Sequence, residues 1–217
     1  MLVLLPPSEG KAHPEAGEPV DLGSLVFAEG LGQRREEVLD ALDPSLREAP
    51  AAPAAEVYTG VLYQRLALPE LPAKARRQVL IASALWGFVR PGDRIPYYRL
   101  PPKERLEGIG PLAKHWRPSL AEALPDKKGD LILDMRSGAY STMWKPKRAT
   151  LLAVRAFAEN DGERKAVSHM AKAVRGDVAR ALLQSKKSPA DPAGAVAIAE
   201  GAGFAVELND GNLDVIV

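Results

Sequence analysis

The chain has 217 residues, of which 46% are hydrophobic; this is enough to bury a core and fits one domain. The absence of cysteine excludes disulfides, thiolate nucleophiles, zinc ribbons and Cys-ligated iron–sulfur clusters. No apolar run approaches the ~20 residues of a membrane helix, and the first residues do not form a signal sequence. We therefore expect a cytoplasmic protein that makes no contact with membranes.

The net charge of +1 hides a strong local asymmetry. Residues 9–70 hold 5 basic and 12 acidic side chains, residues 71–117 hold 10 and 3, and residues 145–187 hold 11 and 4. If the two basic stretches meet in the fold, they form a positive cleft that concentrates polyanions such as DNA. The alternative is that these cations pair with the acidic segment.

Apolar runs and turn signals predict strands at both ends of the chain and in its middle. The first run ends at Pro6-Pro7, and the two terminal hairpins turn at Asn160-Asp161-Gly162 and Asp210-Gly211. The expected strands cover residues 1–5, 79–85, 131–135, 151–157, 165–167, 204–208 and 213–217.

Helical periodicity fills most of the sequence between these strands. Ser137 fits the N-cap of a short helix that extends to Trp144. The expected helices cover residues 34–42, 54–66, 73–78, 111–124, 137–144, 165–183 and 191–200. Residues 44–53 read as a linker and residues 87–100 as a loop. The expected fold is α/β (mixed α+β): a single domain over residues 1–217, with a mixed sheet flanked by helices.

Ser8-Glu9-Gly10-Lys11 follows the first strand, where backbone N–H groups and a lysine can hold a phosphate. The segment lacks the spaced glycines and the Ser/Thr of a Walker motif. Its S-x-x-K spacing also occurs in enzymes whose lysine activates a serine. Anion binding, a plain loop and a serine nucleophile are all open interpretations.

Gly108-Ile109-Gly110-Pro111 resembles the hairpin of helix-hairpin-helix motifs, whose exposed N–H groups bind a backbone phosphate without reading the sequence. Pro101-Pro102 leaves little room for a first helix, so an ordinary glycine loop is the alternative. Lys114 on the following turn suits either interpretation.

The segment from Arg90 to Arg99 interleaves cations with aromatic rings. Guanidinium groups pair with phosphate oxygens, and a base that stacks on a ring gains about 1–3 kcal/mol. Arg90, Arg94, Tyr97, Tyr98 and Arg99 therefore suit unpaired or distorted nucleic acid. Buried tyrosines bonded to arginines would give the same pattern in sequence.

The basic segment 165–183 predicts an amphipathic helix with aliphatic residues on one face and cations on the other. The cationic face carries Lys172 and Arg175 beside Gly176 and Ala179, small residues that would let a bulky anion approach the backbone. An ordinary surface helix with solubilising charges is the alternative.

Five sequence blocks together resemble the peroxide stress resistance protein YaaA family, in the order in which that family carries them. The blocks are LPPSEGK at residues 5–11, VYTGVLY at 57–63, ALWGFVRPGDRIPYYRL at 84–100, LILDMRSGAY at 131–140 and SHMAKAVRGDVAR at 168–180. The resemblance covers nearly the whole chain.

The resemblance implies a cytoplasmic α/β protein with a positively charged cleft and a helix-hairpin-helix element. It also implies binding to DNA, including distorted duplexes, and protection against hydrogen peroxide by limiting free iron. Carried over by position, the family's motifs point to Ser8, Lys11, Arg90, Asp93, Tyr98, Arg99, Lys172, Arg175 and Gly176.

The leading hypothesis is a DNA-binding protein of the oxidative stress response with little sequence preference, no cofactor and a monomeric state. The expected phosphate-binding and stacking residues are Lys11, Arg90, Arg94, Tyr97, Tyr98, Arg99, Gly108, Gly110, Lys172, Arg175, Gly176 and Arg180.

The rival hypothesis is an enzyme that acts on a nucleotide or nucleic acid in the same cleft. Its candidate chemical groups are Ser8, Glu9, Asp93 and His169. Direct iron binding is a third reading, but the three histidines are far apart in sequence and no ligand cluster is identifiable, so we expect no metal site.

Overall fold

The computed structural model describes residues 1–160, 163–166 and 170–217. Its centre is an eight-stranded sheet in the order β11-β12-β9-β8-β1-β3-β4, with β10 paired to β9. Two further sheets of two strands each pair β2 with β5 and β6 with β7. The strands are β1 Leu2–Leu5, β2 Ala51–Pro53, β3 Val79–Ser83, β4 Gly87–Val89, β5 Arg94–Pro96, β6 Arg105–Leu106, β7 Gly110–Pro111, β8 Leu131–Asp134, β9 Thr150–Asn160, β10 Glu163–Ala166, β11 Ala205–Asn209 and β12 Asn212–Ile216.

The middle of the large sheet is parallel. Strand β1 pairs in parallel with β3 on one side and β8 on the other, and β8, β9 and β12 continue in the same direction. The short strands β4, β10 and β11 are antiparallel to their neighbours. β3 and β8 are buried throughout, which is why their sequences read as uninterrupted apolar runs. The mixed α/β class expected from the sequence is confirmed.

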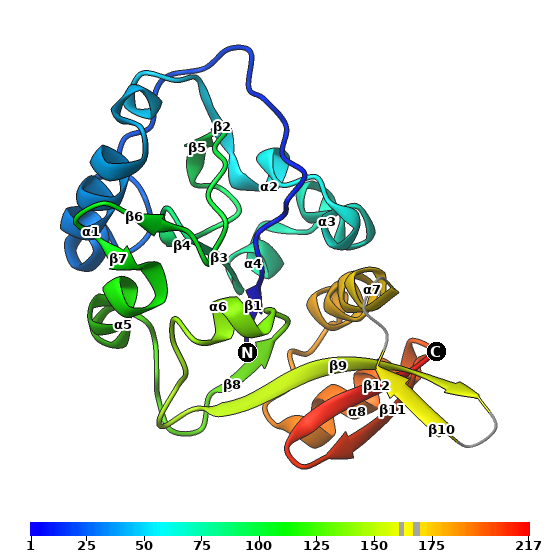
Figure 1. Ribbon diagram of the computed structural model, residues 1–217. Helices are drawn as coiled ribbons and strands as arrows, with labels where there is room; N and C mark the ends of the chain where they lie inside the picture. The colour runs from blue at the N-terminus through cyan, green and yellow to red at the C-terminus, as the bar shows by residue number, and fades with distance from the viewer. Residues whose placement is uncertain (161–162, 167–169) are drawn as a thin grey trace.

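Helices lie on either side of these central strands. In Figure 1, α1 and α5 lie together at the left of the view and α3 and α7 at the right, with β1, β3 and β8 between them. The helices are α1 Ala28–Leu42, α2 Ala54–Val57, α3 Val61–Leu66, α4 Ala73–Arg76, α5 Leu112–Ala123, α6 Gly138–Ser141, α7 Met170–Gln184 and α8 Pro192–Gly201, with 3₁₀ turns η1 Pro44–Arg47 and η2 Leu68–Glu70.

Strand β9 extends well beyond the carboxyl end of its neighbour β8. Residues 150–153 of β9 pair with β8, whereas residues 157–160 pair with β10. Phe157 also pairs with Ile216 of β12, so β12 occupies one side of β9 at this point. β10 therefore lies on the other side of β9, the side on which β8 pairs with residues 150–153. The β9–β10 ribbon therefore extends past the end of β8.

Four sequence predictions of local structure were wrong. The expected helix at residues 54–66 is two helices, because the chain runs extended through Tyr58 and Gly60 before α3 begins. The expected loop at 87–100 contains strands β4 and β5, and the expected linker contains η1 and β2. Helix α6 ends at Ser141, three residues before the expected Trp144.

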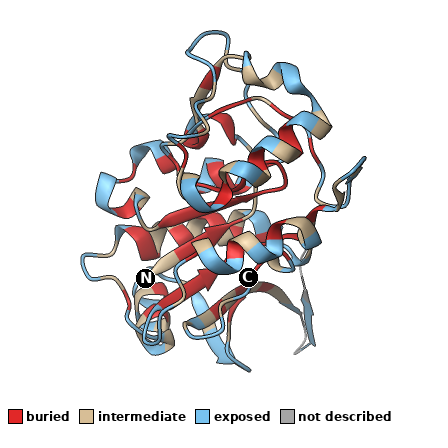
Figure 2. Ribbon diagram, turned by 90° about the vertical axis from the view of Figure 1, so that its left-hand side faces the viewer, coloured by how far each residue is buried: buried red, intermediate tan, exposed pale blue. Residues whose placement is uncertain are grey.

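The core is apolar apart from a few polar groups that tie elements together. Figure 2 shows buried central strands surrounded by helices whose outer faces are exposed. One of these groups is Arg35 of α1, which is fully buried and donates to the carbonyl oxygens of Val26, Trp86 and Phe88. These bonds fix α1 against the turn between β3 and β4.

Candidate functional site

The strongest concentration of polar groups in the core lies at the carboxyl ends of β1, β3 and β8, which we call the carboxyl edge. β1 leads into residues 6–11, the Lys11 loop; β3 ends at Ser83 and β8 at Asp134. From β1 the chain passes first to β3 on one side and later to β8 on the other. In open α/β sheets, ligands bind beyond the carboxyl ends of the strands at such a switch point.

The Lys11 loop is held in place by groups that flank α3. The Gly60 N–H donates to Ser8 Oγ (2.7 Å), and the Tyr63 hydroxyl donates to the Pro6 carbonyl oxygen (2.6 Å). A β carbon at Gly60 would overlap Ser8 Oγ, so a larger residue there would displace the Ser8 side chain from this bond. Ser8 is 7% exposed and already accepts this bond, which favours an anchoring role over the nucleophilic role considered from sequence.

The Lys11 amine lies over two buried aromatic rings. Its Nζ is 4.7 Å from the Tyr98 ring centroid and 5.9 Å from that of Tyr58. Burial lowers the pKa of Lys11; the carboxylate of Glu9 opposes this effect and the Arg99 cation reinforces it. Lys11, Glu9 and Arg99 are therefore close enough to interact, and the last two are exposed.

Beneath Lys11 the hydroxyl groups form a buried chain. The Tyr98 hydroxyl lies 2.8 Å from the Tyr58 hydroxyl and 2.8 Å from Ser83 Oγ. Burial raises the pKa of Tyr98 to about 12 and raises those of Tyr58, Tyr63 and Tyr140. The floor of the site is thus neutral and hydrogen-bonded. Tyr98 is 3% exposed, so the expectation that it offers an open face to a base is wrong.

A buried ion pair closes the β8 end of the carboxyl edge. Arg136 donates from Nε and Nη2 to the two carboxylate oxygens of Asp134, at 2.8 Å each, and from Nη1 and Nη2 to the carbonyl oxygens of Tyr140 and Trp144. The Arg136 side chain is 0% exposed. These bonds hold the segment that carries α6 and Tyr140 beside the Lys11 loop.

Arg175 of α7 reaches the same edge. Its Nε donates to the Val154 carbonyl oxygen (3.0 Å), one residue past the β9 position that pairs with Asp134. Burial lowers the pKa of Arg175, and the charge of Asp134 opposes that effect. Of the predicted cations, Lys11 and Arg99 are therefore close together at the carboxyl edge, and Arg175 lies near Asp134 at the end of β8. Lys172, three residues earlier in α7 and exposed, is on the same face of α7 as Arg175.

Other predicted residues serve the fold. Arg90 donates to the Arg77 carbonyl oxygen, and Arg94 to the Ala51 carbonyl oxygen. Asp93 accepts from the backbone N–H groups of Val26 and Arg90, which closes the loop between β4 and β5. Burial raises the pKa of Asp93, and these bonds oppose that shift.

Tyr97 stacks on His13, with the ring centroids 3.5 Å apart. One face of the ring proposed as a stacking platform is therefore already covered by the imidazole.

Helix α7 uses its small residues for packing. A β carbon at Gly176 would lie 2.5 Å from the Leu62 carbonyl oxygen and 2.8 Å from Arg65 Cβ, and Ala179 is 0% exposed. The expectation that these residues admit an anion is wrong, because α3 fills that space. Arg180 bonds the Leu66 carbonyl oxygen and pairs with Glu70 at 2.8 Å.

The Gly108–Gly110 segment is a tight ribbon, with both glycines at φ 74°. It joins β6 to β7 directly before α5, and a cavity of about 640 Å³ lies beside it, lined by Arg34, Arg105, Lys114 and His115 among others. The chain before the ribbon forms strands β5 and β6, so the first helix of a helix-hairpin-helix is missing from the described residues 87–111.

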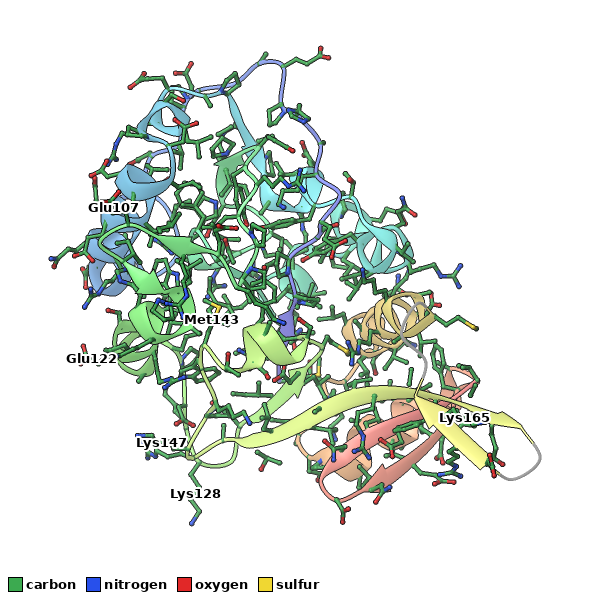
Figure 3. The ribbon with its side chains drawn as sticks, viewed as in Figure 1. Glu107, Glu122, Lys128, Met143, Lys147 and Lys165 are labelled. Atoms are coloured by element: carbon green, nitrogen blue, oxygen red, sulfur yellow. The ribbon has the colours of Figure 1, made fainter. Side chains whose placement is uncertain are left out.

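The basic charge of residues 145–187 is spread over both ends of the sheet. In Figure 3, Lys128 and Lys147 project into solvent at the lower left, near the amino ends of β8 and β9, while Lys165 projects from β10 at the right. Arg155 and Arg164 pair with Asp214 and Glu207 in the C-terminal hairpin. Pairing between basic and acidic segments therefore accounts for part of the asymmetry.

The sequence analysis did not single out Tyr58, Tyr140, Ser83 or the Asp134–Arg136 pair. Tyr58, Tyr140 and Arg136 do lie in the blocks VYTGVLY and LILDMRSGAY, and that is the signal that could have identified them. The candidate His169 lies outside the described residues. Within the described part of the chain, no three His, Asp or Glu side chains gather as metal ligands would.

Comparison with known proteins decides the family. The family described as "Peroxide stress protein YaaA" matches residues 20–207. The chain belongs to this family. A UPF0246 protein of Streptomyces coelicolor is 41% identical over 95% of this chain and 92% of its own length. A UPF0246 protein of Corynebacterium efficiens is 39% identical over 100% of this chain and 98% of its own length.

A more distant relative, an uncharacterized protein of Campylobacter jejuni, is 28% identical over 81% of this chain. Membership of the peroxide stress family fits a role in oxidative stress.

Among the described helices, none has the length and apolar character needed to span a bilayer.

Proposed function

We propose that this member of the YaaA family binds DNA through the carboxyl edge of its sheet, as part of the response to peroxide. The observation that carries the proposal is that Lys11 with Arg99, and Arg175 beside Asp134, lie at one edge, although they come from three distant parts of the sequence. Lys172 adds a fourth, exposed cation on the same face of α7 as Arg175. Like charges repel, so holding them together costs free energy that a bound polyanion returns.

The site favours contacts with phosphate over readout of bases. Arg99 and Lys172 are exposed and long enough to reach a strand that passes across the edge, whereas the aromatic rings below are buried. Contacts to phosphate fix the position of a protein on DNA but carry little sequence information. We therefore expect weak sequence preference and a strong dependence on salt.

Fluorescence anisotropy with labelled duplex, single-stranded and bubble DNA over a series of salt concentrations tests the proposal. The double variant Arg99→Ala/Lys172→Ala removes two exposed cations from the carboxyl edge. The matched control, Lys128→Ala/Lys147→Ala, removes two exposed cations near the amino ends of β8 and β9. Both variants lower the net charge by two, so a difference in their DNA affinities shows that the position of the cations matters and not only their number.

The expected result is that the carboxyl-edge variant binds at least about ten times more weakly at low salt, while the control stays close to wild type. The slope of log affinity against log salt should fall by about two, since each lost phosphate contact contributes about 0.9. Equal losses in both variants, or no binding by wild type at low salt, would overturn the proposal.

We further propose that any limitation of free-iron damage follows from DNA binding and not from iron storage. Equilibrium dialysis of the whole chain against Fe²⁺ tests this point. Stoichiometric retention of the ion would contradict it.

A further inference from the structure

We propose that Lys11 is an amine nucleophile that forms an imine with the aldehyde of an open-chain phosphorylated pentose. The source to which we commit is the abasic residue of DNA, whose sugar opens to an aldehyde between two phosphates. This choice rests on the proposed function, whereas the chemistry of Lys11 rests on its position over the rings of Tyr98 and Tyr58 and beside Arg99.

The first argument is the environment of the amine. Nζ lies over the rings of Tyr98 and Tyr58, and Lys11 is partly buried. Lysines become nucleophilic when they are desolvated or placed beside another cation, and here Arg99 supplies the second condition. Within the described residues, Lys11 takes part in none of the ion pairs shorter than 4.0 Å, whereas Arg155, Arg164 and Arg180 do.

The second argument is the neutrality of the floor. The hydroxyl groups of Tyr58, Tyr98 and Ser83 bond one another, and burial holds the tyrosines in the neutral form. Among the described residues of this floor there is no carboxylate, and the acidic group that acts on Lys11 is the exposed Glu9 at the mouth. A carboxylate at the mouth can accept a proton from the Lys11 amine and return it, while the amine stays over the rings.

The third argument is the position of Arg99. It is exposed and close enough to Lys11 for its charge to act on the amine. A guanidinium binds a phosphate by two parallel hydrogen bonds, so it would hold the phosphate next to a sugar whose aldehyde faces Lys11. Ser8 is the competing nucleophile, but its hydroxyl is buried and already accepts from Gly60 N–H.

The step conserves atoms and charge. The unprotonated Lys11 nitrogen attacks the aldehyde carbon, a C–N bond forms, and the carbonyl electron pair moves to oxygen. The nitrogen loses a proton through Glu9, and the oxygen gains one, which gives a carbinolamine. Loss of the hydroxyl group with a second proton releases water and leaves a C=N bond. Hydrolysis reverses each step.

Reductive trapping tests the proposal on the full chain. The protein is incubated with a duplex that carries one abasic residue, sodium borohydride is added, and the covalent adduct is measured on a denaturing gel. Tryptic mass spectrometry then identifies the modified lysine. The expected result is a single adduct on Lys11 that is lost in Lys11→Arg, and whose rate of formation rises with pH as the amine deprotonates.

Lys186→Arg is the matched control, because Lys186 is exposed and lines the same pocket as Gln78, which precedes β3 at the amino ends of the strands. This variant should form the adduct as wild type does. Melting curves establish that Lys11→Arg is folded. An adduct that persists in folded Lys11→Arg, or that maps to other lysines, overturns the proposal.

Two further arms separate this inference from the proposed function. A duplex with a tetrahydrofuran residue has no aldehyde, so its binding by anisotropy reports DNA affinity alone. Free 2-deoxyribose 5-phosphate offers the aldehyde without DNA. Binding without any adduct overturns the role of Lys11 and leaves DNA binding intact. An adduct with the free sugar phosphate but no DNA binding supports Lys11 and overturns the proposed function.

Discussion

The Lys11 loop and helix α7 both combine lysine or arginine with small residues, yet the fold uses them differently. In the loop, Lys11 stays next to Arg99 and over neutral tyrosines. In α7, Gly176 is packed against α3, and Arg180 is paired with Glu70. The comparison teaches that a segment's composition does not locate a site. What decides is whether the neighbours in space satisfy its polar groups or leave them to a ligand.

The largest effect is expected from the ion pair that holds the carboxyl edge. Arg136→Met leaves the buried Asp134 carboxylate without its cation, which should lower the free energy of unfolding by about 3–5 kcal/mol. Urea titration followed by tryptophan fluorescence measures it. Arg99→Met, an exposed position on the same edge, is the control and should change stability by no more than about 0.5 kcal/mol. Equal effects would show that the edge is not organised by this pair.

A smaller effect is expected where α7 meets α3. Gly176→Ala places a methyl group against the Leu62 carbonyl oxygen, and the overpacking should cost about 1–3 kcal/mol. Gly32→Ala in α1 is the matched control, since no atom lies within 4 Å of the new methyl group. Its higher helix propensity should stabilise the protein by about 0.5–1 kcal/mol. If Gly176→Ala is as stable as Gly32→Ala, α3 does not fill the space beside α7.

The smallest effect is expected in the tyrosine floor. Tyr98→Phe removes one hydroxyl from the chain and should cost about 1 kcal/mol at neutral pH. The pKa of Tyr98 is raised from 10.0 to about 12, so its neutral form stabilises the fold fully below pH 10, and that contribution is lost as the pH rises to about 12. Tyr98→Phe should therefore flatten the alkaline fall in stability. An unchanged fall, measured by urea titration at each pH, would contradict this.

The sequence predicts the central strands because parallel strands buried on both faces are apolar throughout, as in residues 79–83 and 131–134. It fails at β4 and β5, where glycine, proline and arginine indicate a loop. There, tertiary contacts override the local signal: Asp93 accepts from the backbone N–H of Val26, and Arg35 donates to the carbonyl oxygens of Trp86 and Phe88. Such contacts span more than fifty residues and leave no periodicity in the sequence.

The Lys11 loop was predictable as a polar segment at the end of a buried strand, but its floor was not. Tyr58 and Ser83 are 40 and 15 residues from Tyr98 in sequence, and only the sheet brings them together. The amphipathic pattern of α7 was ambiguous for a different reason. A face with small residues can admit either a ligand or another helix, and here it admits α3.

The position of β1 has a consequence for the order in which the protein is made. Its four residues are synthesised well before its partners, residues 79–81 and 132–134. The centre of the sheet therefore cannot close on a ribosome until more than half of the chain has emerged, and the long loops involved slow the pairing. Until residues 79–81 have emerged, the apolar strand β1 has no partner in this sheet, and its other side stays unpaired until residues 132–134 follow.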